Sequence, residues 1–100
     1  MIKHVVMWKL KNVAEGNTKL ENIELVKDKL LKLKPIIHAI DTLEVGKNIN
    51  DSESSYDLVL ISTHQDKAAL AEYINHPAHK DAASFIGKVV AERKAVDFEF

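Results

Sequence analysis

The segment IKHVVMWKL, residues 2–10, decides the fold because both of its alternating faces carry apolar residues. In a β-strand, successive side chains point to opposite faces of the sheet. The even-numbered face is the more apolar, so we expect it to meet the core. It consists of Ile2, His4, Val6, Trp8 and Leu10. The odd-numbered face has Val5 and Met7 between two lysines, which indicates a second, partly buried surface such as a subunit interface.

The segments that follow this strand predict a helix and two more strands. Thr18 and Glu21 fit a capping box, with Asn17 as an alternative cap, and Pro35 marks the end of the helix. Its helical repeat runs through Leu20, Ile23, Val26 or Lys27, Leu30 and Leu33. Residues 36–49 alternate as a second strand, in which Gly46 suggests a bulge. Residues 56–64, YDLVLISTH, predict a strand covered on both faces.

The second half of the chain predicts two helical segments and a last strand. Asp66 is suited to cap a helix over residues 67–74. Pro77 cannot continue that helix, but it fits the first position of a new one. The apolar stripe of the new helix is Ala78, Ala82, Phe85, Ile86, Val89 and Val90. The segment KAVDFEF, residues 94–100, closes the chain as a strand with Val96, Phe98 and Phe100 on one face.

The resulting order, β-α-β-β-α-β within a single domain of residues 1–100, is typical of the ferredoxin-like α+β fold. Such a fold has a four-stranded antiparallel sheet with its helices on one face. The other face then needs cover, which a second copy supplies across a two-fold axis. We therefore expect a homodimer that forms through the sheet faces.

Composition narrows the class of protein. The chain has no cysteine and a formal net charge of −1. Disulfides, thiolate zinc sites and thiol nucleophiles are thus excluded, and a reducing compartment is expected. No basic stripe is present to neutralise phosphates, so we expect no nucleic-acid partner. The N-terminus resembles neither a signal peptide nor a membrane span. The expectation is a soluble cytoplasmic domain.

The segment YINHPAH, residues 73–79, is the candidate functional site. Pro77 makes His76 the N-cap of the new helix and puts His79 at the edge of its buried face. Tyr73 shares the inward face of the preceding segment, so Tyr73, His79 and His4 can all face the space between helices and sheet. Polar groups converging on an apolar space are typical of a small-molecule pocket. Trp8, His76 and Phe85 are weaker candidates for substrate contacts.

Other interpretations of these residues stay open. Tyr73 and His79 also suit capping and packing at a helix break, and His4 suits a core edge where it bonds a backbone carbonyl. Trp8 also suits plain core packing. His76 and His79 have a spacing that could share a metal, but no cysteine or acidic residue completes the set, so neither a metal nor a cofactor is expected. We expect His38 and Asp41 at the edge of the sheet and His64 in solvent.

The segments IKHVVMWKLK, YDLVLISTHQDKAALAEYINHPAHKD and AVDFEF together resemble the stress-responsive A/B barrel (Dabb) family over essentially the whole chain. The resemblance implies a ferredoxin-like protomer whose sheets pair into a dimeric α/β barrel. One plant branch of the family is a cofactor-free polyketide cyclase that makes olivetolic acid by an aldol condensation. By this resemblance, His79 would be the base, Tyr73 would hold the substrate carbonyl, and His4 would orient the substrate.

Two functions follow as hypotheses. The first is a cofactor-free lyase or cyclase that acts on an enolisable ligand through His79 and Tyr73. The second is a non-catalytic stress-response or interaction protein whose stable dimer is the functional unit. Haem-degrading and quinone-type monooxygenases use the same architecture, but a lone Trp8 and a helix-borne histidine do not select that class.

Overall fold

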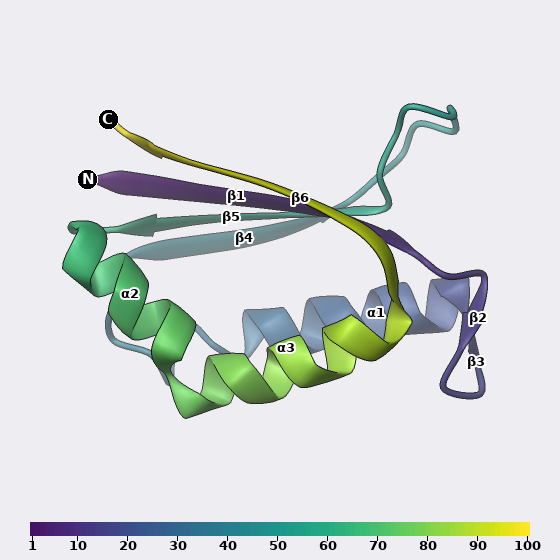
Figure 1. Cartoon of the computed structure of the whole chain (residues 1–100), viewed down its shortest axis with the longest axis horizontal. Coiled ribbons are helices and arrows are strands. Elements are labelled where there is room, and N and C mark those ends of the chain that lie inside the picture. The colour runs from purple at the N-terminus through teal and green to yellow at the C-terminus, as the bar shows by residue number, and fades with distance from the viewer.

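The computed structural model describes residues Met1–Phe100 and confirms the predicted ferredoxin-like α+β order. Its elements are β1 (Ile2–Leu10), β2 (Val13–Ala14), β3 (Asn17–Thr18), α1 (Lys19–Leu31), β4 (Thr42–Lys47), β5 (Leu58–His64), α2 (Lys67–Asn75), α3 (Pro77–Val89) and β6 (Val90–Glu99). Four strands form one antiparallel sheet in the order β4-β5-β1-β6. All three helices cover the same face of that sheet (Figure 1).

The two faces of β1 differ as the alternation predicts. Every even-numbered residue of β1 is at most 6% exposed, so this face builds the core under the helices. Met7 on the other face is 38% exposed. Residues that pair across strands share a face, so Val5 lies beside Ile61 of β5 and Val96 of β6 on the side without helices.

The helix starts agree with the predicted caps. Thr18 accepts a hydrogen bond from the Glu21 amide, and the Glu21 carboxylate accepts one from the Thr18 amide, which completes the capping box. The Asp66 carboxylate accepts from the Ala69 amide at 2.8 Å. The apolar stripe of α1 was predicted one turn too long, however, because Leu20 is 76% exposed while Ile23, Val26 and Leu30 are buried.

The connection between α1 and β4 differs from the prediction. The helix ends at Leu31 rather than near Pro35, and β4 begins only at Thr42. Between them the chain makes turns, with the Ile37 amide bonded to the Leu33 carbonyl and the Ile40 amide bonded to the Ile37 carbonyl. Leu33, Ile37 and Ile40 are all buried. Their spacing of four and three residues suits successive helical-type turns, so it overrides the apparent alternation of residues 36–41.

Three smaller details also correct the expectation. The register of β4 with β5 runs through Gly46 without a bulge, and a Cβ at Gly46 would lie 3.3 Å from a Val59 methyl carbon. β6 begins at Val90, directly after α3, rather than at residue 94. The loop after β1 contains a short hairpin of β2 and β3, whose turn uses the positive φ angles of Glu15 (52°) and Gly16 (74°).

None of the helices has the length and apolar character needed to cross a membrane.

Candidate active site

The break between α2 and α3 places the central residues of the site. His76 has φ −66° and ψ 137°, an extended conformation that ends α2 and redirects the chain. Its Nδ1 accepts a hydrogen bond from the Ala78 amide at 3.0 Å, and Pro77 takes the first position of α3. Across this break the rings of Tyr73 and His79 meet edge to face, with centroids 4.6 Å apart.

Tyr73 is the centre of a cluster of four rings. Its centroid lies 5.9 Å from that of His4 on β1 and 5.0 Å from that of His64 on β5. Tyr73 and His64 are both fully buried, and His4 is 4% exposed. Three histidines from one helix and two strands therefore surround one tyrosine in the space between the helices and the sheet.

A cavity of about 190 Å³ opens beside this cluster. Its lining residues are mostly apolar: His4, Val6, Trp8, Leu30, Leu60, Tyr73, His79, Ala82, Ala83, Ile86, Gly87, Val90 and Arg93. The polar members come from β1, α2, α3 and β6. No carboxylate is among them, so the cavity has a hydrophobic wall with a few basic or hydroxyl groups.

Two residues that line the cavity each carry a buried polar atom with no hydrogen-bond partner in the protein, namely the Tyr73 hydroxyl and the His79 Nδ1. Leaving a buried donor or acceptor unpaired costs about 1–3 kcal/mol per group. Native proteins pair nearly all such groups, and an exception calls for a specific explanation. Pairing both atoms takes a ligand with two groups, an oxygen that accepts from the Tyr73 hydroxyl and an acidic C–H or other donor group that faces the His79 Nδ1.

Burial fixes the charge states of these two groups. It raises the pKa of Tyr73 to about 12, which keeps the hydroxyl protonated and able to donate at neutral pH. Burial also lowers the pKa of His79 below its ordinary value of 6.5. The backbone of Ile74 favours the protonated form, but no hydrogen bond of normal geometry joins it to the ring. A neutral imidazole has one donor N–H and one acceptor nitrogen, so it can supply an acceptor beside the donor hydroxyl of a neutral phenol.

His4 has a different arrangement. Its Nδ1 lies 2.5 Å from the Asp97 Oδ1 on the neighbouring strand β6. A carboxylate only accepts hydrogen bonds, so His4 donates through Nδ1 and its Nε2 is left to interact elsewhere. The expected partner of His4 was a backbone carbonyl, and the structure supplies a carboxylate instead. This contact orients the His4 ring at the edge of the cavity.

His64 corrects the sequence interpretation, because it is fully buried rather than in solvent. Its Nδ1 donates to the Ala39 carbonyl at 2.9 Å, and its Nε2 accepts from the Ser62 hydroxyl at 2.9 Å. Burial lowers the pKa of His64, although the Ala39 carbonyl acts in the opposite direction. The alternation of β5 would have predicted this burial, because His64 lies on the same face of the strand as the core residues Leu58 and Leu60.

The other sequence candidates take separate places. Trp8 lines the cavity. His76 caps α3, and Phe85 packs against the core with the Lys29 Nζ 4.9 Å from its ring centroid; neither lines the cavity. His38 and Asp41 are exposed next to β4, as expected for edge residues. No group of three or more histidine, cysteine or acidic side chains is arranged to hold a metal.

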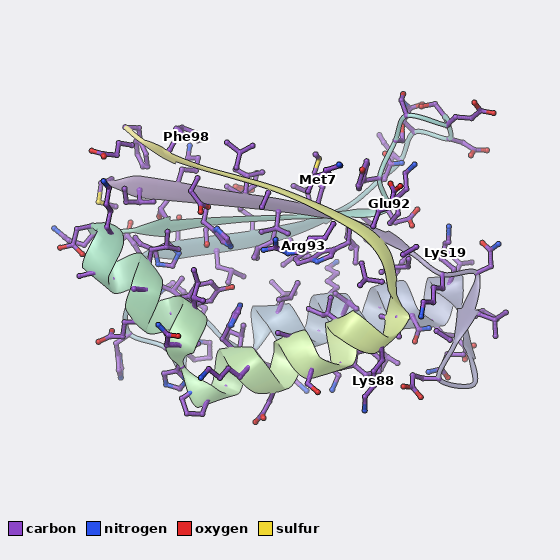
Figure 2. The ribbon with its side chains drawn as sticks, in the orientation of Figure 1. Met7, Lys19, Lys88, Glu92, Arg93 and Phe98 are labelled. Carbon is purple, nitrogen blue, oxygen red and sulfur yellow. The ribbon has the colours of Figure 1, made fainter.

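Arg93 was not a sequence candidate. It lies on β6, paired in register with Trp8 of β1, and it lines the cavity. Figure 2 shows Arg93 on the helix-facing side of the sheet, whereas Met7 and Phe98 lie on the opposite side. The predicted strand began at residue 94, so it left out this position.

Comparison with solved structures agrees with this fold. A dimeric protein of unknown function from Bacteroides fragilis is 29% identical, with a TM-score of 0.88, over 99% of this chain and 95% of that chain. A protein from Arabidopsis thaliana is 27% identical, with a TM-score of 0.81, over 99% of this chain and 94% of that chain. The hydroxynitrile lyase of Passiflora edulis is 13% identical, with a TM-score of 0.80, over 97% and 90% of the two chains, and this likeness concerns the fold alone.

Sequence comparison identifies the family. Searching curated protein sequences gives no significant match. The family model described as "Stress responsive A/B Barrel Domain" matches residues 2–100. This match confirms the resemblance in the strand, helix-break and C-terminal segments. The chain therefore belongs to the stress-responsive A/B barrel (Dabb) family.

Proposed function

We propose that the protein is a cofactor-independent lyase or cyclase that removes a proton from a carbon next to a carbonyl group. The observation that carries the proposal is a pair of unpaired buried atoms, the Tyr73 hydroxyl and the His79 Nδ1, on two residues that line one largely apolar cavity. An uncompensated donor and acceptor cost stability, and a substrate that pairs with both offsets this cost.

The proposed reaction begins with a proton transfer. The neutral imidazole of His79 takes the proton from the substrate carbon, and the C–H electron pair forms the double bond of an enolate. The negative charge moves to the carbonyl oxygen, where it accepts a hydrogen bond from Tyr73. A donor aimed at the developing oxyanion stabilises the transition state more than the ground state. The enolate then attacks a second carbonyl of the same molecule or expels a leaving group, and the proton on His79 passes to the oxygen or group that receives the charge.

The cavity limits the size of the substrate. An engineered apolar cavity of about 150 Å³ in another protein admits benzene. At about 190 Å³, this cavity suits a molecule slightly larger than benzene. Trp8 and the small residues Ala82 and Ala83 supply apolar walls, and His4, held by Asp97, orients the substrate from the sheet side.

Deuterium exchange tests the proposal directly. Small enolisable ketones are incubated with the protein in D₂O, and loss of their α-proton signals is followed by NMR. The wild-type protein is expected to accelerate exchange above buffer, and His79→Gln is expected to reduce the acceleration by about 10²-fold or more. His38→Gln, at an exposed site, is the control that keeps the activity. If folded His79→Gln exchanges as fast as wild type, His79 is not the base.

A second function is favoured by the sheet face without helices. That face has a continuous apolar patch made of Val5, Met7, Val59, Ile61, Val96 and Phe98. We propose that two copies pack these faces together as a homodimer, which closes an α/β barrel. Dimeric relatives with the same fold support this assembly. If no exchange activity is found, this dimer is the functional unit of a non-catalytic stress-response or interaction protein.

A further inference from the structure

Arg93 brings a positive charge to the cavity that the catalytic proposal does not use. It points inward from β6, next to Trp8 in the register, and the residue is exposed although it lines the cavity. Figure 2 shows it between the sheet and α3. A guanidinium in this place faces any molecule that enters.

No carboxylate of the protein neutralises this guanidinium. None of the ion pairs in the structure includes Arg93. No acidic residue lines the cavity. The next carboxylate on the inward face of β6, Asp97, lies four residues further along the strand, about 13 Å away, and it is bonded to His4. Glu92, adjacent in sequence, pairs with Lys9 and Tyr56 on the other face.

The charge of Arg93 also reaches the two central groups. Burial is the main cause of the lowered pKa of His79, and Arg93 lowers it further. Burial raises the pKa of Tyr73, and Arg93 acts against that rise. Tyr73, His79 and Arg93 all line the same cavity, so a ligand that touches the first two also faces the guanidinium.

We infer that the substrate is a small keto acid, whose carbonyl oxygen bonds Tyr73 while its carboxylate pairs with Arg93. This inference rests on the proposed function and adds a substrate class to it. A guanidinium binds a carboxylate with two parallel hydrogen bonds, which fixes the orientation of the ligand as well as its position. Neutralising Arg93 in this way also removes a charge that opposes protonation of His79, so binding of the acid makes His79 a better base.

A matched pair of probes tests the charge preference without requiring catalysis. Benzoate and benzamide have the same shape and differ in charge, and both suit the cavity in size. Their binding is measured by NMR titration of the ¹⁵N-labelled protein, with the signals of cavity residues as the readout. Wild type is expected to bind benzoate about tenfold more tightly than benzamide. Arg93→Gln is expected to remove that preference and leave benzamide binding unchanged.

Lys94→Gln is the matched control, because Lys94 is the next residue of β6 but pairs with Met7 on the opposite face of the sheet. It removes the same charge and is expected to keep the preference for benzoate. Equal affinities for both probes, or a preference that survives Arg93→Gln, would overturn the inference and leave the cavity proposal intact. If the protein binds benzoate selectively but does not accelerate deuterium exchange of the ketones, the proton-transfer mechanism is wrong and the charge preference stands. If neither probe shifts the cavity signals, the inference is wrong, and deuterium exchange of the ketones alone decides the proposed function.

Discussion

Tyr73 and His79 belong to different helices, yet their rings lie edge to face with centroids 4.6 Å apart. Six residues of unbroken α-helix would turn one side chain by about 600° and leave the two about 120° apart around the axis. The extended backbone of His76 and the helix start at Pro77 prevent this divergence. The break is therefore what brings a donor and an acceptor to the same cavity.

Replacing Tyr73 with phenylalanine separates function from stability. Because the Tyr73 hydroxyl is buried and unpaired, its removal is expected to keep the free energy of unfolding or raise it by about 1–2 kcal/mol. Loss of the donor is expected to slow deuterium exchange by about 10²-fold. Urea denaturation and the exchange assay measure the two effects. A destabilised variant with full activity would show that the hydroxyl has a structural role.

The pH dependence of exchange reports the charge state of His79. The base must be neutral, so the rate constant is expected to rise with pH through the pKa of His79 and to be constant above it. Burial lowers this pKa, so the midpoint of the rise is expected below 6.5. The pH profile of kcat/KM gives the pKa of His79 in the free enzyme. A midpoint at or above 6.5 would contradict a buried His79 base.

Stability is expected to fall in mildly acidic solution for a related reason. Burial gives both His64 and His79 a folded-state pKa below the unfolded value of about 6.5. The unfolded chain therefore binds more protons, and the free energy of unfolding decreases as the pH falls from about 6.5 through the folded-state pKa values. His64→Phe is expected to flatten this slope, whereas His38→Phe, at an exposed site, leaves it unchanged. Urea denaturation at several pH values checks both variants.

The fold was largely predictable because its signals are local. Alternation in residues 2–10, the capping residues Thr18 and Asp66, and the helix start at Pro77 each depend on neighbours in sequence. The failure at residues 36–41 has a physical reason. Ile37 and Ile40 are buried in turns, and a short apolar run fits an alternating strand and a turn equally well until its tertiary contacts are known.

The site was less predictable because it depends on pairing between distant strands. His4 meets Asp97 through the register of β1 with β6, and no local pattern encodes that register. His64 was correctly predicted at the end of a strand but wrongly expected in solvent, because Tyr73 of α2 and the turn at Ala39 cover it. Arg93 was missed because the predicted strand began after it. The proximity of Tyr73 and His79 was predictable because the break that joins them lies within seven residues of sequence.

A charge on the sheet face without helices tests the dimer. Val96 is 63% exposed in the protomer and pairs with Val5 at the centre of the apolar patch, so Val96→Lys is expected to fold normally. Each substitution occurs twice in a two-fold interface, once in each copy. The two new lysines would be buried near Lys3 and Lys94 without an acidic partner. We expect dimerisation to weaken by about a hundredfold or more, measured by light scattering across a range of concentrations.

Leu20→Lys is the matched control for this prediction, because Leu20 is 76% exposed on α1, on the helix side of the molecule. It adds the same charge away from the sheet face and is expected to leave the dimer intact. Deuterium exchange by a Val96→Lys monomer carries further information, because the residues that line the cavity already come together within one protomer. Retained exchange would show that the dimer serves stability rather than catalysis. A wild-type monomer, or a Val96→Lys dimer as tight as wild type, would remove the proposed interface.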